Sequence, residues 1–325
     1  MLKTKFLHVA LIASTFSLAC SQAPTTNDAT ADSVSGTQAV EANSDALLYG
    51  KEADDKTFPA VGALVYYLPE IGVLDVFCSG TLVGGKAVVT ARHCTPSIDN
   101  AFAFGVLPAI AFGPNAFEPT QVVPITSYVA APAGPGPSNG LLLDGGRDVA
   151  VAYLESKPDH IKPVKLGLFD GPRMLGKKLT AAGYGVYDPA YLYGEKFSGT
   201  VTARALSGKW YKLLFDGNYK AYHDWYFTDS PSAIPSEDEA KQWWDLYKLE
   251  TNYELLAGGL PGDALGCFGD SGGPLFSTSH GCDPTLVGVS FAVEASKANV
   301  CMGGGGYLVF NRKMLDFVEG AVSKK

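Results

Sequence analysis

Residues 266–275 read Gly-Cys-Phe-Gly-Asp-Ser-Gly-Gly-Pro-Leu, a stretch in which backbone geometry and chemistry are specified together. Glycines on both sides of Ser271 permit turns that are closed to other residues, and they let backbone amides approach a ligand closely. The amides of Gly269 and Ser271 are therefore candidates for holding a developing oxyanion, which is usually the largest single contribution to the catalysis of acyl transfer. The Ser271 hydroxyl is then a candidate nucleophile, and it needs a base.

The candidate bases are the five histidines, His8, His93, His160, His223 and His280. His93 stands apart because it follows a β-rich run and is flanked by cysteines. Asp148 supplies a carboxylate that could orient its imidazole, since this acid leads into the apolar run Val149–Leu154. Asp144, in the glycine-rich loop just before it, is the nearest rival. The three candidates occur along the chain in the order His, Asp, Ser.

The glycine-framed serine, the cysteine spacing around His93 and this chain order together resemble the chymotrypsin or trypsin family (S1) of serine peptidases, in a bacterial exported or lipoprotein form. The resemblance implies an all-β fold of two antiparallel Greek-key barrels with a C-terminal helix. It also implies hydrolysis of peptide bonds through an acyl-enzyme: His93 takes the Ser271 proton, Asp148 holds the imidazolium, and the Gly269 and Ser271 amides bind the oxyanion. Such enzymes need no cofactor, and none is expected.

Two disulfides are implied by the same resemblance, Cys78 with Cys94 and Cys267 with Cys301. Spacing alone cannot fix connectivity, so a different pairing among Cys267, Cys282 and Cys301 stays open. Six cysteines in an exported chain favour disulfides over a metal site. A structural zinc site is not expected, because His93 is the one histidine at ligand spacing to a cysteine pair.

The beginning of the chain has the pattern of an export signal. Two lysines precede the apolar run 6–19, which predicts a signal peptide over residues 1–19. Cys20 permits two processing routes, ordinary cleavage before it or its lipidation, which would anchor the protein at a membrane surface. Residues 20–46 contain no aromatic residue and are expected to be a flexible tether or an activation peptide. The expected location is the bacterial periplasm, outer membrane or exterior.

The folded part is expected to start at Leu47, where the sequence resembles the mature amino terminus of the family. The resemblance implies a zymogen in which cleavage frees the Leu47 amino group to pair with Asp270. Ala46 precedes the cut instead of Arg or Lys, so a peptidase without trypsin-type specificity is expected to act as the activating protease. The predicted parts of the peptidase domain, 47–325, are a first barrel at about 47–160, a second at about 167–310, an insertion at about 187–260 and a C-terminal helix at about 311–323.

Strand-like runs recur between turn residues, as in an antiparallel barrel. Those in the first half of the domain are 60–67, 77–83, 87–90 and 101–106. The insertion is rich in aromatic residues, and within it Ser236 and Glu239 form a capping box that predicts a helix to about Glu250. Two interpretations of the aromatic residues stay open: they pack an inserted helix onto the second barrel, or they form a wall beside the substrate cleft.

The resemblance also implies the positions of a specificity pocket, Leu265, Ser290, Phe291, Ala292 and Gly305. Trypsin-like members carry at the place of Leu265 the Asp that binds Arg or Lys. A basic side chain therefore finds no countercharge here, unless Asp263 or Glu294 turns into the pocket. The expected preference is for apolar or aromatic residues before the scissile bond.

Composition limits the classes of partner. The net charge of −8 argues against nucleic acid, because phosphate binding needs clustered Lys and Arg. No internal stretch approaches the roughly 20 apolar residues of a membrane span. Protein or peptide substrates are expected instead. The alternative function is a catalytically silent surface binding or adhesion protein on the same fold; the aromatic insertion and the missing basic activation site favour it, and the intact set of catalytic residues opposes it.

Overall fold

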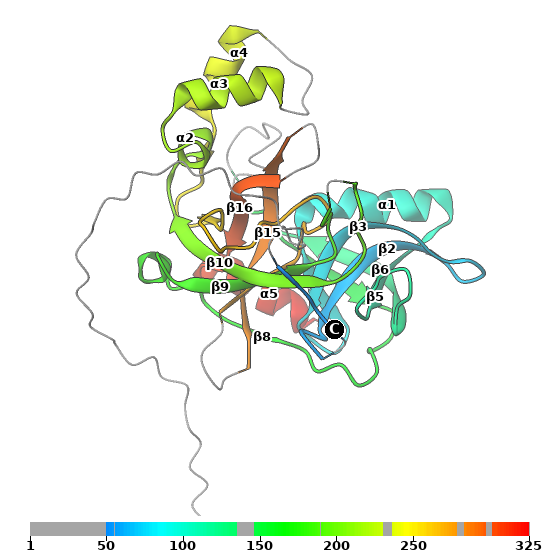
Figure 1. Ribbon diagram of the computed structural model, residues 1–325. Coiled ribbons are helices and arrows are strands. Elements are labelled where there is room, and N and C mark those ends of the chain that lie inside the picture. Colours follow the sequence, from blue (N-terminus) through cyan, green and yellow to red (C-terminus); the bar gives the residue numbers. More distant parts are fainter. Residues whose placement is uncertain are drawn as a thin grey trace, which may run out of the picture.

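The computed structural model describes residues 50–54, 56–134, 146–188, 190–229, 236–277, 283–296 and 301–324. They form two β-barrels, a group of helices beyond the second barrel and a C-terminal helix (Figure 1). The predicted signal peptide, the tether, Leu47, Cys20 and Cys282 lie outside the described residues. In the described part of the chain, no helix combines the length and the apolar character that crossing a membrane requires.

The first barrel is closed by antiparallel pairing. Its strands, in the order of pairing, are β2 (Val61–Leu68), β3 (Gly72–Leu82), β4 (Ala87–Thr90), β7 (Ala150–Leu154), β6 (Gln121–Ala130) and β5 (Leu107–Phe112). Ala63 of β2 pairs with Ser79 on one side and Ala111 on the other, which closes the ring. Strands β4 and β7 are buried along their whole length. They form the rigid support from which the first two candidate catalytic residues project.

One run expected as a strand is a helix. Residues Thr95–Phe104 form α1, which includes most of the predicted strand 101–106. Pro96 suits the first turn of a helix, where its missing N–H costs nothing, and Ile98 and Ala101 repeat at helical spacing and are both buried. Gly105 ends the helix with φ of 71°, a conformation that favours glycine.

The second barrel is closed in the same manner. Its strands, in the order of pairing, are β9 (Lys178–Gly183), β10 (Phe197–Ala205), β13 (Glu254–Ala257), β16 (Cys301–Val309), β15 (Thr285–Ala295) and β14 (Pro274–Ser277), which returns to β9. Short strands β1 (Lys51–Glu52) and β8 (Lys165–Leu166) add to β10 and β15. A 3₁₀ turn, η3 (Gly171–Met174), precedes β9.

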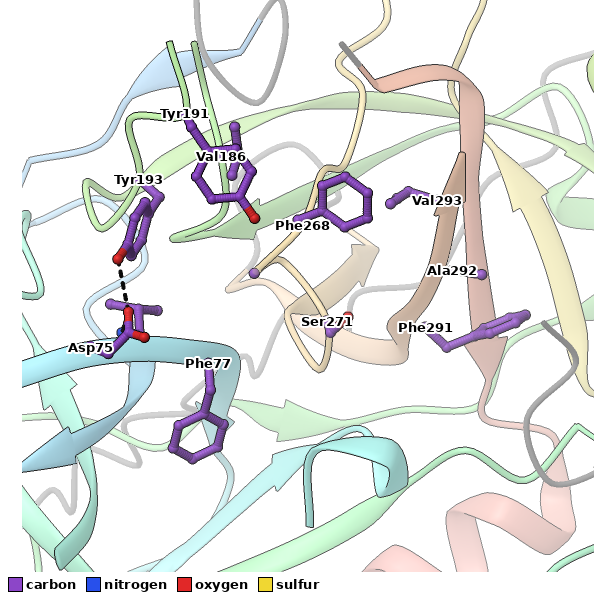
Figure 2. Close-up of a pocket in the computed structure, with 12 residues that line it drawn as sticks. Asp75, Phe77, Val186, Tyr191, Tyr193, Phe268, Ser271, Phe291, Ala292 and Val293 are labelled. Atoms are coloured by element: carbon purple, nitrogen blue, oxygen red, sulfur yellow. Dashed lines mark hydrogen bonds between the residues drawn. The ribbon is translucent and has the colours of Figure 1, made fainter. Parts of the chain in front are cut away.

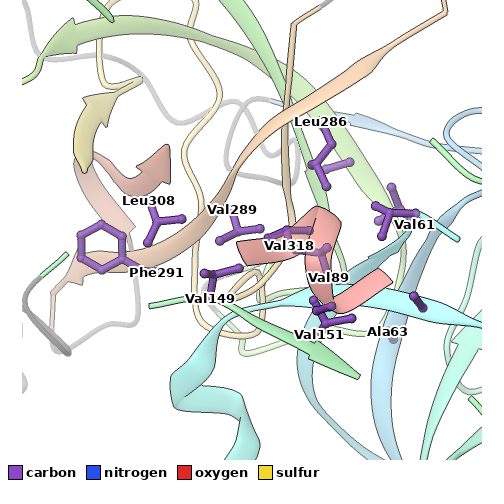
Figure 3. Packing of buried hydrophobic residues seen from close by; sticks show 14 of the residues in the cluster. Val61, Ala63, Val89, Val149, Val151, Leu286, Val289, Phe291, Leu308 and Val318 are labelled. Atoms are coloured by element: carbon purple, nitrogen blue, oxygen red, sulfur yellow. The ribbon is translucent and has the colours of Figure 1, made fainter. Parts of the chain in front are cut away.

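A shared core joins the barrels. Figure 3 shows valines of the first barrel, among them Val89 and Val151, facing Val289 and Leu308 of the second. Helix α5 (Arg312–Val322) adds Val318 to this core. All of these side chains are buried, so the two barrels pack as one body and the line where they meet is fixed. The all-β two-barrel fold with a C-terminal helix and a helical insertion is confirmed.

The insertion is shorter than expected. It spans 206–253, because two segments of the predicted 187–260 are barrel strands, β10 and β13. Val201 and Ala203 of β10 alternate inward and are fully buried, which is the period of a strand. The insertion contains α2 (Trp210–Leu214), α3 (Tyr219–Thr228) and α4 (Glu237–Leu246), and the strand pair β11 (Gly208–Lys209) and β12 (Lys248–Leu249).

The inserted helices have a core of their own. Its buried rings are Trp210, Tyr211, Tyr222, Trp225, Tyr226, Trp244 and Tyr247. The Ser236 hydroxyl accepts a hydrogen bond from the Glu239 amide, as the capping box predicts, and α4 ends at Leu246 instead of Glu250 because the chain enters β12. The aromatic core packs on the second barrel through Ala292 and Met302. Packing therefore accounts for these aromatic residues.

Candidate active site

His93 and Asp148 lie together at one end of the first barrel. His93 belongs to the 3₁₀ turn η1 (Arg92–Cys94) after β4, and Asp148 precedes β7. Pairing of Thr90 with Ala150 brings these two ends side by side. His93 Nδ1 is 2.6 Å from Asp148 Oδ2, and the His93 amide donates to Asp148 Oδ1 at 2.8 Å. The buried carboxylate thus fixes the ring, and Nε2 is the nitrogen left to exchange a proton.

Ser271 reaches the same place from the second barrel. It lies in the turn before β14, and its carbonyl oxygen accepts a hydrogen bond of 2.8 Å from the Ser79 amide of β3. The same oxygen is 3.8 Å from Sγ of Cys94, the neighbour of His93. Among the described residues no hydrogen bond joins the Ser271 hydroxyl to the His93 ring; such bonds are often long until a substrate is bound.

Two glycines make this turn sterically feasible. Gly269 and Gly272 have φ of 96° and 79°, which side chains rarely adopt. A Cβ on Gly272 would lie 2.1 Å from Oγ1 of Thr90 and 2.5 Å from the Ser79 carbonyl oxygen. The serine turn can therefore contact the first barrel only where glycine follows the serine.

The backbone amides of the turn fall into two groups. Those of Asp270, Gly272 and Gly273 donate to carbonyl oxygens within the fold. The amides of Gly269 and Ser271 have no acceptor among the described residues, and both residues line the cavity described below. Two uncommitted N–H groups beside a candidate nucleophile are the elements of an oxyanion hole.

Both implied disulfides are present. Cys78 and Cys94 are bonded, with 6.3 Å between their Cα atoms, and they tie β3 to the turn that carries His93. Cys267 and Cys301 are bonded, with 5.5 Å between their Cα atoms, and they tie the serine loop to β16. Cys78, His93 and Cys94 come within 4.8 Å of one another at their ligand atoms, but the two sulfurs are bonded to each other and do not supply thiolates to a metal.

A cavity of about 460 Å³ opens above Ser271 (Figure 2). One end is lined by Asp75, Val76 and Phe77 of β3 together with Val186, Tyr191 and Tyr193. The opposite end is lined by Phe291, Ala292 and Val293 of β15, with Phe268 between the two. Both barrels contribute to it, and the Tyr193 hydroxyl joins them by donating to Asp75 Oδ1 at 2.8 Å. An extended chain could pass through such a cavity across the serine.

Comparison with known proteins points to the family that the sequence resembles. Residues 48–201 match the family model described as Trypsin. The match supports the trypsin-like serine peptidase family. Melanization protease 1 of Drosophila melanogaster is 24% identical over 251 residues, which are 71% of this chain and 54% of that protein. The chain thus spans about half the length of this curated relative.

The fold has a counterpart among solved structures. Mouse neuropsin, described as a serine protease expressed in the limbic system of the brain, is 20% identical, with a TM-score of 0.52. The similarity covers 83% of this chain and 98% of the neuropsin chain. It supports the two-barrel fold.

The expected specificity residues divide into two groups. Phe291 and Ala292 line the cavity, whereas Leu265, Ser290 and Gly305 are buried behind it. Gly266, the neighbour of Leu265, lies close to Ser290: a Cβ on Gly266 would be 4.0 Å from Ser290 Oγ, 3.9 Å from the Tyr307 hydroxyl and 3.5 Å from a methyl group of Val293.

Asp263 and Glu294 could have supplied a negative charge to bind a basic substrate residue. Neither side chain lines the cavity. Asp263 accepts hydrogen bonds from the amide and hydroxyl of Thr202 at 3.1 and 2.8 Å. Glu294 accepts a hydrogen bond of 2.9 Å from Trp210 Nε1 in the insertion. Burial raises the pKa of Glu294 to about 7, against the effect of its hydrogen bonds from Trp210 and Tyr211.

Asp270, the acid beside the nucleophile, is buried and points away from it. Its carboxylate accepts hydrogen bonds from the amides of Gly185 at 2.9 Å and Cys267 at 2.8 Å. Burial raises the pKa of this carboxyl to about 6, while the two N–H donors lower it. No cation pairs with it in the described part of the chain, and Leu47 lies outside that part. A Cβ on Gly183 would overlap with Asp270 Oδ1, so glycine is required there too.

Several residues at the site were not predicted. Phe268 and Val293 follow or adjoin predicted positions, and sequence proximity could have suggested them. Asp75 and Tyr193 are 118 residues apart, and no local pattern predicts their contact. Glu254, on β13, is buried, and burial together with the charges of nearby acids, Asp148 among them, raises its pKa to about 7.

Proposed function

We propose that the chain is a serine endopeptidase that hydrolyses peptide bonds in proteins or peptides. The observation that carries this proposal is the meeting of three features at the junction of the barrels: the His93–Asp148 contact, the Ser271 turn and the two uncommitted amides. The first feature comes from the first barrel, and the other two come from one turn of the second barrel. Acyl transfer requires these features to meet at one place, as they do at the junction of the barrels. A turn with a purely structural role would not require it.

In the proposed reaction, His93 Nε2 takes the Ser271 proton as Oγ attacks the substrate carbonyl carbon. The oxyanion of the tetrahedral intermediate accepts hydrogen bonds from the Gly269 and Ser271 amides, and Asp148 stabilises the imidazolium. His93 then gives its proton to the leaving amine as the peptide bond breaks. Water, deprotonated by His93, attacks the resulting ester, and the acid product leaves with Ser271 restored.

Steady-state hydrolysis tests the proposal. Wild type should cleave a peptide ester, and Ser271→Ala and His93→Ala should each lose nearly all activity. Persistent inactivity of wild type, with residues 1–46 removed as well as present, would favour the silent binding protein instead.

We propose a preference for apolar or aromatic residues before the scissile bond. Phe268, Phe291 and Val293 line the cavity, and Asp263 and Glu294 are both engaged elsewhere, which supports this preference. The test compares kcat/KM for substrates that differ only at that residue. Faster cleavage after Arg or Lys than after Phe, Tyr or Leu would overturn the proposal.

We also propose that the protein is made as a zymogen and exported. A buried Asp270 without a cation in the described part of the chain supports pairing with an amino group freed at Leu47 by an activating protease. The pattern at residues 1–20 supports export, with the mature protein secreted or lipid-anchored through Cys20. Incorporation of labelled palmitate that Cys20→Ala abolishes would distinguish the anchored form from the secreted one.

A further inference from the structure

The first barrel exposes a set of large apolar side chains outside the cleft. Their exposed fractions are 73% for Ile71, 42% for Leu74, 46% for Phe102, 81% for Phe104 and 37% for Leu107. They come from three neighbouring elements, the β2–β3 hairpin, the end of α1 and the start of β5, which lie together at one side of the molecule (Figure 1). We call these five residues the apolar patch. Single exposed apolar residues are ordinary, but a group of this kind marks an interaction site.

The patch contains a hollow. Leu74 and Phe104 line a depression of about 330 Å³ together with Tyr66, Asn100, Ala101 and Val106. Its walls are mainly apolar, and its size suits one or two side chains of a partner. Hydrophobic burial in such a depression favours a protein segment that presents large apolar residues.

The patch continues into the cavity above Ser271. Leu74 lines the hollow, and the next residues along β3, Asp75 to Phe77, line the cavity. At about 3.3 Å per residue the two are only about 10 Å apart along the strand. The Tyr66 ring of the hollow packs on the Phe77 ring, with 4.8 Å between their centroids. One extended segment could thus occupy both.

The direction of that segment follows from the proposed function. The resemblance places the residues before the scissile bond along β15, at the end of the cavity lined by Phe291 to Val293. Asp75 and Phe77 line the opposite end, as Figure 2 shows. The patch therefore lies on the side of the leaving group.

The charges around the patch restrict the partner further. Segments 61–77 and 95–108 carry Glu70, Asp75 and Asp99 and contain no Lys, Arg or His. The acids favour basic residues in the partner, and they oppose an anionic lipid surface, which would need a basic face.

We propose that the apolar patch is an exosite for the part of a protein substrate that follows the scissile bond, a segment with large apolar residues next to Lys or Arg. This proposal rests on the proposed peptidase function for its direction. It extends that function because the exosite would select protein substrates beyond the residues that contact the cavity.

A binding measurement tests the exosite without requiring activity. The full chain with Ser271→Ala is titrated into a fluorescein-labelled peptide, Lys-Leu-Phe-Arg-Leu-Lys, and into its counterpart with Ser in place of Leu and Phe. The apolar peptide should bind more tightly, and Phe104→Ser should weaken its binding about tenfold, as for an anchor residue. Leu168→Ser is the matched control, since Leu168 is 45% exposed and outside the patch, and it should change nothing.

Three results would overturn the proposal: equal binding of the two peptides, binding unaffected by Phe104→Ser, or loss of binding in both variants. Self-association, or attachment to phosphatidylglycerol vesicles, that Phe104→Ser abolishes in the absence of peptide binding would assign the patch to a second copy or to a membrane and also contradict it.

A kinetic measurement separates this proposal from the proposed function. Phe104→Ser should leave hydrolysis of a short ester unchanged while raising KM for a peptide extended by eight residues after the scissile bond. If wild type hydrolyses neither substrate, the peptidase function fails while the binding result stands. If it hydrolyses both and Phe104→Ser affects neither KM, the exosite fails alone.

Discussion

At the scale of single residues, the site depends on a few contacts that fix one orientation each. The two contacts of Asp148 with His93 hold both the imidazole and its turn. The carboxylate is buried in the barrel junction, so its charge acts at low dielectric on the ring. Orientation and charge are thus combined in one residue.

Replacement of Asp148 by Asn tests this role. Asn keeps the shape but offers an amide instead of a carboxylate, so the imidazolium loses its stabilising charge and the ring its correct tautomer. We expect kcat to fall about ten-thousandfold with KM nearly unchanged. Steady-state kinetics on a short ester measure this, with an unaltered melting temperature as the control for folding. A fall of less than about tenfold would contradict the assignment.

Buried Glu294 makes stability depend on pH. Its pKa in the folded protein is about 7, against 4.5 as the ordinary value. Between these two pH values Glu294 is therefore protonated less in the unfolded chain than in the folded protein. The free energy of unfolding falls as pH rises from about 4.5 to about 7. Nearby Tyr211, Tyr222 and Tyr247 have raised pKa values, chiefly through burial, and remain neutral.

Between pH 4.5 and 8, ionisation of Glu294 should lower the free energy of unfolding of wild type by about 3 kcal/mol. We expect this part of the decrease to be absent in Glu294→Gln. Gln retains an acceptor for Trp210 Nε1, so the packing is kept. Urea unfolding of both proteins at the two pH values measures the change in the free energy of unfolding. The pKa values of Glu254 and Asp270 are also raised, so these two residues should account for the pH dependence that remains in the variant. An identical slope in the variant and in wild type would show that Glu294 is not the group responsible.

At the scale of elements, the insertion is attached to the cavity-lining strand. Trp210 of α2 donates to Glu294 of β15, and the aromatic core packs on Ala292, which also lines the cavity. Because the insertion has a core of its own, that core does not determine where the insertion sits on the barrel. This buried hydrogen bond fixes its position against β15.

Two substitutions compare a buried tryptophan whose indole N–H donates a hydrogen bond, Trp210, with one whose indole N–H does not, Trp225. Trp210→Phe removes one of the two hydrogen-bond donors of the Glu294 carboxyl and leaves Tyr211 as the other, and it should lower the free energy of unfolding by about 1–3 kcal/mol. Trp225 Nε1 is buried and has no hydrogen-bond partner in the part of the chain that the structure describes, so Trp225→Phe should cost less. Urea unfolding at pH 8 gives both values. Equal losses, or a greater loss for Trp225→Phe, would contradict the role of the Trp210 hydrogen bond.

Local patterns predicted the segments of the candidate catalytic residues better than the elements around them. His93, Asp148 and Ser271 are each framed by nearby glycines, cysteines or strands, so their segments could be recognised separately. The strand predicted over 101–106 was wrong. Small and large side chains alternate there as in a strand, but Pro96 favours the start of a helix and Gly105 ends it. The Asp75–Tyr193 contact depends on two distant segments meeting across the junction, which no local pattern encodes.

At the scale of the whole molecule, the two barrels pack through a continuous core, and the candidate catalytic residues lie along their junction. His93 and Asp148 come from one barrel and Ser271 from the other. Their relative position therefore depends on the shared core as much as on the turns that carry them.

Activation is a prediction at this scale. A chain that begins at Leu47 should be at least about tenfold more active than one that begins at Ala46, because the extra residue displaces the amino group from Asp270. Ester hydrolysis by the two forms, with matched unfolding curves, measures the effect. Equal activity would contradict the pairing with Asp270.

The central claim is that Ser271 is an activated nucleophile, and a fluorophosphonate tests it most directly. Intact-mass and peptide-mass measurements on the chain that begins at Leu47 should show one adduct, located on Ser271, and His93→Ala should abolish it while the protein stays folded. An adduct on another residue, or equal labelling of Ser271 in the His93→Ala variant, would contradict the account.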